Sequence, residues 1–578
     1  MENRNNLSWK IGGEAGFGIK SAGISLGKIF MKAGYEVFDY TEYPSLIRGG
    51  HNTYQLMIDS QKVNGVSLAI DVLVALNQET ITKHAGELVD QGVIIFDHEN
   101  IEAKNLKLDK KINLLGVPLS VLANQAGGEL MRNVVAMGAT LALVGQDLAI
   151  ANRVIKDTFQ SKGEGVVKNN LQALSLGFEY VKKNYRQKFI CHLPTKTDHH
   201  NILLAANEAM ALGALAGGLN FYAGYPMTPS SSILHYLAGV AESASIVVRH
   251  AEDEISVINM ALGAAHVGAR AMIATSGGGF ALMVEALGLA GMTETPLVII
   301  NVMRPGPATG LPTWTEQGDL QFVLRAAQGD FPRIILAPGD AEEAFYLTAE
   351  ALNLAEVYQT PVIILSDKFI GEGNSTVPKF DTKKIKIDRG KLLTEEQLKK
   401  IKDYQRYQVT SDGISSRALP GMIGGLFVAN SDEHDVYGFV SETSSDRKQQ
   451  VDKRQRKLET MAKNLPEPPV HGNLKGPKTI VLWGSTKGPV LDVYNSLPAE
   501  KKAEIKILQL QYLWPFPVDF VAEILRKSSK VLLIENNNNA QAGQLIAQET
   551  GIIIKDKLLK YDGRPFFRED LVAALNKL

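Results

Sequence analysis

Short apolar runs rich in β-branched residues alternate with helical patterns along most of the chain. Near the N-terminus these runs fall at residues 37–40, 71–76 and 93–96, separated by amphipathic or glycine-bounded segments. The alternation is typical of α/β domains with mostly parallel sheets, because parallel strands need a helix-length connection between them. At 578 residues the chain is longer than one hydrophobic core usually supports. We therefore expect several domains of about 150 residues each.

Changes in composition along the chain predict where these domains end. A polar stretch follows residue 190, and a charged, turn-rich stretch interrupts the α/β pattern over residues 373–477. We therefore expect α/β domains at residues 1–190, 198–372 and 478–578, each doubly wound, with 373–477 as a connecting region. In the second and third domains, strands are expected at 221–223, 246–248, 272–274, 297–302, 334–336, 362–365, 480–482, 505–508 and 531–534.

Charge and cysteine content exclude several classes of function. The chain has 61 Lys and Arg against 62 Asp and Glu, so no overall field favours nucleic acid or an anionic membrane. No stretch has the apolar length of a membrane helix or the form of a signal peptide, so we expect a cytoplasmic protein without a membrane partner. With Cys191 as its single cysteine, the chain cannot hold a cluster or zinc site built on four thiolates.

A glycine-rich turn, GGEAGFG, spans residues 12–18 before a helical pattern. Such a turn exposes backbone N–H groups at a helix N-terminus, where phosphate or carboxylate binds. We expect a tight turn or an anion site at Gly13, Gly16 and Gly18, with Arg48 as a cation from a second glycine-containing turn. A dinucleotide site is disfavoured, because the spacing departs from G-x-G-x-x-G. The predicted helix carries an apolar stripe at Ile19, Ala22, Leu26, Ile29, Phe30 and Ala33.

Three further motifs follow predicted strands of the second domain. Residues 225–232, YPMTPSSS, place Thr228 and several serines at a strand end, where α/β folds bind ligands. Serine or threonine before a helix is also a common helix cap, and this alternative remains open. Residues 252–254, EDE, begin a helix, where acidic side chains are favoured by the helix dipole as well as by acid–base chemistry. Arg304 begins a rigid Pro/Gly loop and can grip a carboxylate through two hydrogen bonds.

Together these stretches resemble the alpha subunit of the 2-oxoacid:ferredoxin oxidoreductases. The resemblance is carried by YPMTPSS, EDEISVINMALGAAHVGA, ATSGGG and RPGPATGLPTWTEQGD, in that order. The N-terminal GGEAGFGI and YPSLIRGGHN resemble the gamma subunit of the same family, fused ahead of alpha. The last domain resembles a transketolase C-terminal-like domain. The resemblance thus implies a gamma-type domain, a thiamine diphosphate pyrimidine-binding domain and a transketolase C-terminal-like domain.

The resemblance also implies an activity and a set of site residues. The family decarboxylates a 2-oxoacid on thiamine diphosphate, giving acyl-CoA, CO2 and reduced ferredoxin. Glu254 matches the glutamate that hydrogen-bonds the aminopyrimidine, ahead of Glu252, and Tyr225 and Pro226 fall on the cofactor side. Substrate-binding residues are matched by Thr228, Arg304 and Thr313. The gamma-like glycines and Arg48 are the candidates for the CoA side.

This sequence lacks the residues for two binding sites of the family, the Mg2+–diphosphate site and the iron–sulfur cluster site. No Gly-Asp-Gly motif exists for the Mg2+ that holds the diphosphate, and one cysteine cannot ligate an iron–sulfur cluster. In the family a beta subunit carries both sites, so we expect shared thiamine diphosphate and no metal on this chain. We also expect CoA, ferredoxin and a 2-oxoacid as partners, in a heterotetramer with two copies of each chain.

Several alternatives remain. The fused arrangement resembles 2-oxoglutarate-type and broad-specificity enzymes more than single-chain pyruvate enzymes. We favour 2-oxoglutarate, with pyruvate or a broad range of 2-oxoacids as alternatives. A regulatory or assembly subunit that kept the fold without its chemistry is a second reading. A nucleotide-binding oxidoreductase based on residues 12–18 is a third. The basic stretch 446–457 is predicted to be a solvated helix, with docking of an acidic ferredoxin as the alternative.

Overall fold

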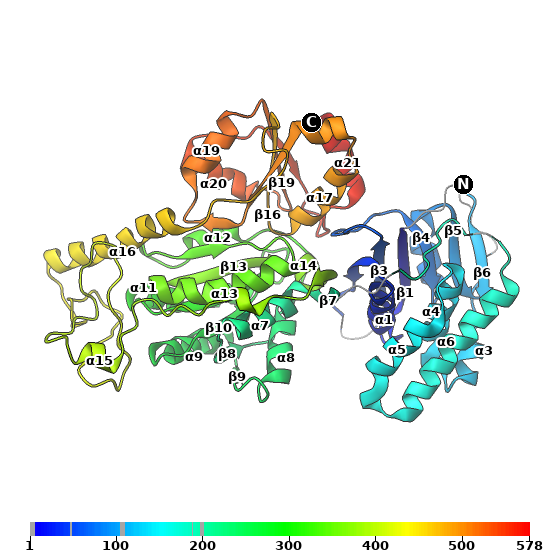
Figure 1. Cartoon of the computed structure of the whole chain (residues 1–578), viewed down its shortest axis with the longest axis horizontal. Helices are drawn as coiled ribbons and strands as arrows, with labels where there is room; N and C mark the ends of the chain where they lie inside the picture. The colour runs from blue at the N-terminus through cyan, green and yellow to red at the C-terminus, as the bar shows by residue number, and fades with distance from the viewer. Residues whose placement is uncertain (1–5, 47–48, 104–109, 188, 197–200) are drawn as a thin grey trace.

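The structure is a computed structural model that describes residues 6–46, 49–103, 110–187, 189–196 and 201–578. Figure 1 shows three α/β lobes: one in blue and cyan, one in green, and one in orange and red above the green lobe. The yellow connecting region lies at the end of the green lobe that is away from the blue one. The expected α/β class with three domains is confirmed.

The first lobe contains an eight-stranded sheet in the order β6-β5-β4-β1-β3-β2-β14-β7. Its strands are β1 (Leu7–Glu14), β2 (Glu36–Glu42), β3 (His51–Asp59), β4 (Ile70–Ala75), β5 (Leu88–Asp97), β6 (Asn113–Val117), β7 (Asn201–Ala205) and β14 (Asn374–Pro378). The expected strands near residues 37, 71 and 93 are confirmed as β2, β4 and β5. The sheet is mixed rather than mostly parallel, because β3 runs antiparallel to both β1 and β2. The β2–β3 connection is too short for the helical crossover that a parallel pair needs.

Helices cover this first sheet, and the amphipathic helix predicted after the glycine turn is one of them. The helices are α1 (Ile19–Lys32), α2 (Gln78–His84), α3 (Leu119–Gln125), α4 (Arg132–Leu143), α5 (Leu148–Phe159) and α6 (Glu164–Asn184). All six residues of the predicted apolar stripe of α1 are buried, which confirms that stripe as its core face.

The second lobe contains seven strands in the order β18-β12-β13-β11-β10-β8-β9. They are β8 (Phe221–Gly224), β9 (Val247–His250), β10 (Ala271–Thr275), β11 (Leu297–Met303), β12 (Ile334–Leu336), β13 (Pro361–Asp367) and β18 (Tyr512–Trp514). The six strands expected between residues 198 and 372 are confirmed, and they are all parallel. The seventh, β18, comes from the C-terminal part of the chain and runs antiparallel to β12. The helices are α7 (Ala206–Ala216), α8 (Ser231–Val240), α9 (Glu254–His266), α10 (Gly277–Leu282), α11 (Val284–Met292), α12 (Leu320–Arg325), α13 (Ala341–Tyr358) and α14 (Lys368–Glu372).

The third lobe has five strands in the order β15-β17-β16-β19-β20. They are β15 (Val470–Gly472), β16 (Lys478–Trp483), β17 (Ile505–Leu510), β19 (Lys530–Glu535) and β20 (Asp556–Leu559), with helices α17 (Lys487–Ser496), α18 (Ala499–Glu504), α19 (Val518–Arg526), α20 (Gln541–Thr550) and α21 (Arg568–Lys577). The three strands predicted here are confirmed as β16, β17 and β19. This lobe is joined to the second by Gln317, whose side chain donates to the Trp483 carbonyl and accepts from the Asn536 N–H.

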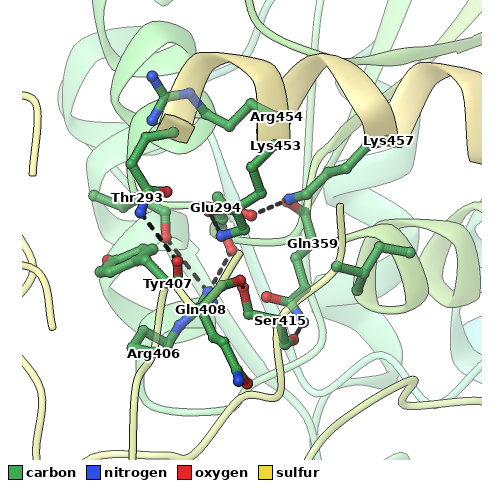
Figure 2. Close-up of polar contacts among 12 residues, drawn as sticks. Thr293, Glu294, Gln359, Arg406, Tyr407, Gln408, Ser415, Lys453, Arg454 and Lys457 are labelled. Atoms are coloured by element: carbon green, nitrogen blue, oxygen red, sulfur yellow. Dashed lines mark hydrogen bonds and ion pairs between the residues drawn. The ribbon is translucent and has the colours of Figure 1, made fainter. Parts of the chain in front are cut away.

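The connecting region holds α15 (Glu395–Leu398) and α16 (Ser444–Asn464), and α16 corrects one prediction. The basic stretch is helical, but it is not fully solvated: the side chains of Lys453 and Lys457 are completely buried. Both ammonium groups pair with Glu294, as Figure 2 shows. Residues four apart share one helix face, so the two lysines meet the same buried carboxylate. The ion pairs of Lys453 and Lys457 with Glu294 thus hold the charged helix α16 against the second lobe.

Candidate active site

Four neighbouring parallel strands of the second sheet end at one edge, and the predicted site residues follow them. Strands β9, β8, β10 and β11 are adjacent in the sheet and run in the same direction. The loop with Thr228 follows β8, and α9 with Glu254 follows β9. Gly277, Gly278 and Gly279 follow β10 and form the first turn of α10, and Arg304 follows β11. Ligands of open α/β sheets bind at this carboxyl edge.

Glu254 is distinguished from its acidic neighbours by burial. Asp253 caps α9, and its carboxylate accepts a hydrogen bond from the Ser256 N–H at 2.7 Å. Glu252 is exposed, whereas Glu254, the first residue of α9, is 4 % exposed. Within the described residues, the Glu254 Oε1 atom is buried without a hydrogen-bond partner. Burying such an atom costs free energy unless a ligand or solvent satisfies it.

The glycine-rich first turn of α10 leaves the space that the Glu254 side chain occupies. A Cβ atom at Gly279 would lie 2.6 Å from the Glu254 Oε1 atom. At Gly278 a Cβ atom would face Ala308 and Met227, at 3.9 and 4.0 Å. The turn therefore brings Glu254, the loop after β8 and the loop after β11 together around one small area.

Arg304 connects the loops after β11 and β8. Its Nη1 atom donates to the backbone carbonyl of Thr228 at 2.6 Å. Burial lowers the pKa of Arg304 and the nearby Asp319 raises it, but the guanidinium stays charged because its ordinary pKa is so high. The structure thus brings Arg304 and Thr228 into contact, on the same sheet edge as Glu254.

The hydroxyl groups of Thr313 and of the serine Ser230 in the 225–232 loop have hydrogen-bonding environments that the sequence did not predict. Thr313 is 4 % exposed, and its hydroxyl has no hydrogen-bond partner among the described residues. Ser230 stands at the N-cap position of α8 without capping it through its side chain. Its hydroxyl donates instead to the Met227 carbonyl at 2.7 Å and so closes the loop. Tyr225 is 38 % exposed at the site's rim, next to exposed Pro226.

Two carboxyl groups that the motifs did not single out also belong to this edge. Asp319 accepts a hydrogen bond from the Asn301 Nδ2 atom at 3.0 Å, and burial raises its pKa. Glu316 is half-buried, and burial together with the Asp319 charge raises its pKa to about 7. A Cβ atom at Gly277 would lie 2.7 Å from Asp319, so the same glycine turn makes room for a second carboxylate. In the sequence, the feature that could have predicted these two carboxyl groups is the acidic end of the TWTEQGD stretch.

The gamma-like glycine turn lies in the first lobe, beside a cavity. Gly16 and Gly18 have φ values of +92° and +70°, which favour glycine, whereas Gly13 packs against Leu76. A cavity of about 270 Å³ lies against this turn and the start of α1. Asn133 lines it, 7 % exposed, and its Oδ1 atom has no partner among the described residues. Arg48 lies outside the described residues.

The described residues provide neither a cluster of metal ligands nor a membrane-spanning helix. No group of three or more His, Cys, Asp and Glu side chains in this part of the chain is arranged to hold a metal ion. Within the same residues, none of the helices has the length and apolar character needed to span a membrane.

Comparison with known proteins identifies the family. Residues 212–453 match the model of the thiamine diphosphate-binding domain of pyruvate flavodoxin/ferredoxin oxidoreductases, and residues 8–180 match that of pyruvate ferredoxin/flavodoxin oxidoreductases. A 2-oxoacid:ferredoxin oxidoreductase alpha subunit from Sulfolobus sp is 34 % identical, over 99 % of this chain and 97 % of the relative. A 2-oxoglutarate oxidoreductase subunit of Mycobacterium tuberculosis is 29 % identical, over 98 % of this chain and 90 % of that protein.

A solved structure agrees with these relatives. The 2-oxoglutarate:ferredoxin oxidoreductase from Magnetococcus marinus, with 2-oxoglutarate, coenzyme A and succinyl-CoA bound, is 31 % identical with a TM-score of 0.92. The match covers 99 % of both chains. The chain therefore belongs to the 2-oxoacid:ferredoxin oxidoreductases, as an alpha subunit with a thiamine diphosphate-binding domain and a gamma-like domain fused at its N-terminal side.

Proposed function

We propose that this chain binds the aminopyrimidine of thiamine diphosphate and the carboxylate of the 2-oxoacid, in an enzyme that converts 2-oxoglutarate and CoA to succinyl-CoA and CO2. The two electrons released pass to ferredoxin. The observation that carries the proposal is the sheet edge where buried Glu254 meets the loops of Thr228 and Arg304. Its residues supply the two kinds of group that such a reaction needs, a proton-transferring carboxyl and an anchor for a carboxylate.

The unpartnered Oε1 atom of Glu254 fits the cofactor's aminopyrimidine. A ring nitrogen there would satisfy the buried atom, and the carboxyl would hold a proton on that nitrogen. Tyr225 and Pro226, at the rim of the same edge, would border the ring. Thiamine diphosphate supplies, when bound, the electron sink that decarboxylation of a 2-oxoacid requires.

Arg304 would orient the substrate. Its Nη1 atom is held by the Thr228 carbonyl, which fixes the plane of the guanidinium. The other N–H groups of that plane can donate to the substrate carboxylate, placing the neighbouring carbonyl carbon for attack. The hydroxyls of Thr228 and Thr313 are the candidates for hydrogen bonds to the substrate oxygens, and the unpaired Thr313 hydroxyl supports this role.

A second subunit would complete the site. The sequence lacks a Gly-Asp-Gly motif and has a single cysteine, so the diphosphate with its Mg2+ and the iron–sulfur cluster would lie on a beta subunit. We place both chains in a heterotetramer with two copies of each. We keep the proposed domains at residues 1–190, 198–372, 373–477 and 478–578, with four strands, β7, β14, β15 and β18, each joining the sheet of a neighbouring domain.

The choice of 2-oxoglutarate rests on relatives whose names range from 2-oxoacid to 2-oxoglutarate oxidoreductase. The Magnetococcus marinus structure contains 2-oxoglutarate, coenzyme A and succinyl-CoA. A substrate panel on the purified complex tests the choice: the kcat/KM for 2-oxoglutarate should exceed that for pyruvate and for branched 2-oxoacids. Equal values would identify a broad-specificity enzyme instead.

CoA would bind on the gamma-like side. The cavity beside Gly16 and Gly18 combines free N–H groups at the start of α1 with the unpaired amide oxygen of Asn133. Asn133→Ala should raise the KM for CoA and leave the KM for the 2-oxoacid unchanged. A change in both values, or in neither, would remove Asn133 from the CoA site.

The two alternative readings differ in what they require of the structure. A regulatory subunit needs no convergence of Glu254, Thr228 and Arg304, so their shared sheet edge argues against it. A dinucleotide-binding domain places its glycine turn after a strand with parallel neighbours, whereas β1 has antiparallel β3 on one side.

Substitution of Glu254 tests the proposed function directly. In the complex with its beta subunit, Glu254→Gln should lower 2-oxoacid-dependent ferredoxin reduction by about 100-fold or more, since it removes the acid–base group. Glu252→Gln is the matched control, because Glu252 is an exposed carboxylate two residues away. Wild-type turnover of the Glu254→Gln complex would refute the proposal.

A further inference from the structure

The loop between β8 and α8, residues 225–230, is held by side chains that donate to two successive backbone carbonyls. The Thr228 carbonyl accepts from Arg304 Nη1 at 2.6 Å. The next carbonyl, that of Pro229, accepts from the Nδ2 atom of Asn207 at 2.9 Å. Pro229 is buried, so its carbonyl needs a partner within the protein. The loop that carries Thr228 therefore depends on one donor from the end of β11 and one from α7.

The side-chain amide of Asn207 has one possible orientation. Asn207 is the second residue of α7 and is 0 % exposed. Its Nδ2 atom donates a second hydrogen bond, to Ser232 Oγ in the first turn of α8, at 2.9 Å. A flipped amide would place its oxygen against the Pro229 carbonyl, and two acceptors cannot bond each other. The NH2 group must therefore face the loop.

The amide oxygen of Asn207 bears the cost of this arrangement. Among the described residues the Oδ1 atom has no hydrogen-bond partner, and a Cβ atom at Gly371 would lie 3.0 Å from it. Burying an amide oxygen without a hydrogen bond is destabilising, and an apolar side chain would avoid that cost. What the asparagine contributes is its pair of donors, which join the last part of the loop to the helix that follows it.

We infer that Asn207 is a positioning residue for the 2-oxoacid, because it fixes the Pro229 carbonyl and with it the adjacent Thr228 carbonyl that holds Arg304. Asn207 is fully buried, so it acts through Arg304 rather than by touching the substrate. The inference rests on the proposed function, in which Arg304 binds the substrate carboxylate.

Loss of the Asn207 donor should act on substrate binding more than on the chemical step. Without it the buried Pro229 carbonyl lacks a partner, and the loop shifts toward another donor. The Thr228 carbonyl then moves, and the guanidinium of Arg304 loses the orientation that a bidentate grip on a carboxylate needs. Glu254 follows a different strand and keeps its position. An interaction that is equally strong in the ground and transition states affects KM and leaves kcat nearly unchanged.

Steady-state kinetics of the complex with its beta subunit provide the test. Asn207→Ala should raise the KM for 2-oxoglutarate about tenfold, the effect of weakening one hydrogen bond to a charged group. The kcat and the KM for CoA should stay within a few-fold of wild type. An unchanged KM for 2-oxoglutarate, or an equal rise in the KM for CoA, would overturn the inference.

Gln450 offers a matched control in α16. It is 1 % exposed, its Nε2 atom donates to the Tyr407 carbonyl at 3.1 Å, and its Oε1 atom has no partner among the described residues. Gln450→Ala thus removes a buried amide of the same kind from the connecting region. It should lower the unfolding midpoint but leave the KM for 2-oxoglutarate unchanged. Equal rises in KM for both variants would reduce the effect of Asn207→Ala to a general loss of stability and overturn the inference.

A double-mutant cycle with Arg304→Met shows whether Asn207 acts through Arg304. In the Arg304→Met complex, Asn207→Ala should change the kcat/KM for 2-oxoglutarate by less than about twofold, because residues that act as a unit are not additive. Losses that multiply would overturn this inference alone. Wild-type kcat/KM for Arg304→Met would overturn the proposed role of Arg304 as well, so the two failures are distinguishable. If Asn207→Ala does not fold, Asn207→Asp takes its place, since it keeps the shape and replaces the NH2 donor by an oxygen.

Discussion

A Cβ atom at Gly279 would lie 2.6 Å from Glu254 Oε1, so the carboxylate occupies space that only glycine leaves free. The same Cβ atom would lie 2.2 Å from Thr275 Oγ1. Gly279→Ala should therefore displace Glu254 together with Thr275 and lower turnover by about 100-fold, because small displacements of a reacting group have effects of that size. Overpacking should cost about 1–3 kcal/mol of stability. Steady-state ferredoxin reduction and thermal unfolding of the complex measure the two effects.

Gly278→Ala is the control for this substitution. A Cβ atom at Gly278 would have its nearest neighbour at 3.9 Å, which is ordinary contact. The Gly278 variant should therefore keep turnover within a few-fold of wild type. Equal losses at positions 278 and 279 would show that the turn, rather than the position of Glu254, controls activity.

Glu316 should make the protein less stable as pH rises. Burial, with the Asp319 charge, raises the pKa of Glu316 from 4.5 to about 7, so the folded protein holds this proton more tightly than the unfolded chain. The unfolded chain then releases the proton first, and the folded state loses relative stability between those two pKa values. Glu316→Gln should therefore gain thermal stability over wild type on going from about pH 4.5 to about pH 7.

The companion variant Asp319→Asn checks the electrostatic part of this effect. Removing the Asp319 charge takes away one cause of the raised pKa of Glu316 and should shift the upper end of the pH window downward. A stability difference between Glu316→Gln and wild type that is constant across the whole pH range would contradict the assignment.

Glu294 of the second lobe, which pairs with Lys453 and Lys457 of the connecting region, should be a costly carboxylate to remove. Burial disfavours its charge, but Lys453, Lys457 and Arg406 hold its pKa well below its usual range. Glu294→Gln would leave two buried ammonium groups without a carboxylate and should cost about 3–5 kcal/mol in urea unfolding. Lys448→Gln, which breaks an exposed pair with Asp452, should cost only about 0.3–0.5 kcal/mol.

Replacing the whole buried cluster gives the opposite result to replacing Glu294 alone. The triple change Glu294→Met, Lys453→Met and Lys457→Met removes the charges together with their desolvation cost. It should recover most of the stability that Glu294→Gln loses, since apolar residues of similar volume often replace buried ion pairs without penalty. A triple variant less stable than the single one would show instead that the lysines are needed for other contacts, such as the hydrogen bond from Lys457 Nζ to the Gln359 carbonyl.

The basic helix α16 should not control the reaction with ferredoxin. Lys453 and Lys457 are buried in ion pairs, and exposed Lys448 is paired with Asp452, so little net positive charge faces solvent. Lys448→Glu should leave the rate of ferredoxin reduction unchanged at low ionic strength. A slower rate that high salt abolishes would instead identify α16 as a docking surface, since steering by charge depends on ionic strength.

The pairing of distant strands in the first-lobe sheet could not be predicted from the sequence. Strand β7 precedes the second lobe and β14 begins the connecting region, yet both extend the sheet beyond β2. Asn374 of β14 donates to the buried Asp39 carboxylate through its backbone N–H at 2.8 Å and its side chain at 2.7 Å. Pairing between segments more than 300 residues apart leaves no local pattern, because each strand has the same alternation whichever neighbour it finds.

The α/β elements, the apolar face of α1 and the order of the motifs that contain Glu254, Thr228 and Arg304 could all be predicted from the sequence. These features depend on residues that are close in the sequence, through hydrophobic periodicity and turn chemistry, so they can be predicted without the structure. Three features became visible in the folded chain alone: Glu254 is buried and Glu252 is not, Asp319 and Glu316 lie at the same sheet edge, and Lys453 and Lys457 face Glu294. Burial and pairing of charges depend on which distant segments meet, and that is settled by packing rather than by local sequence.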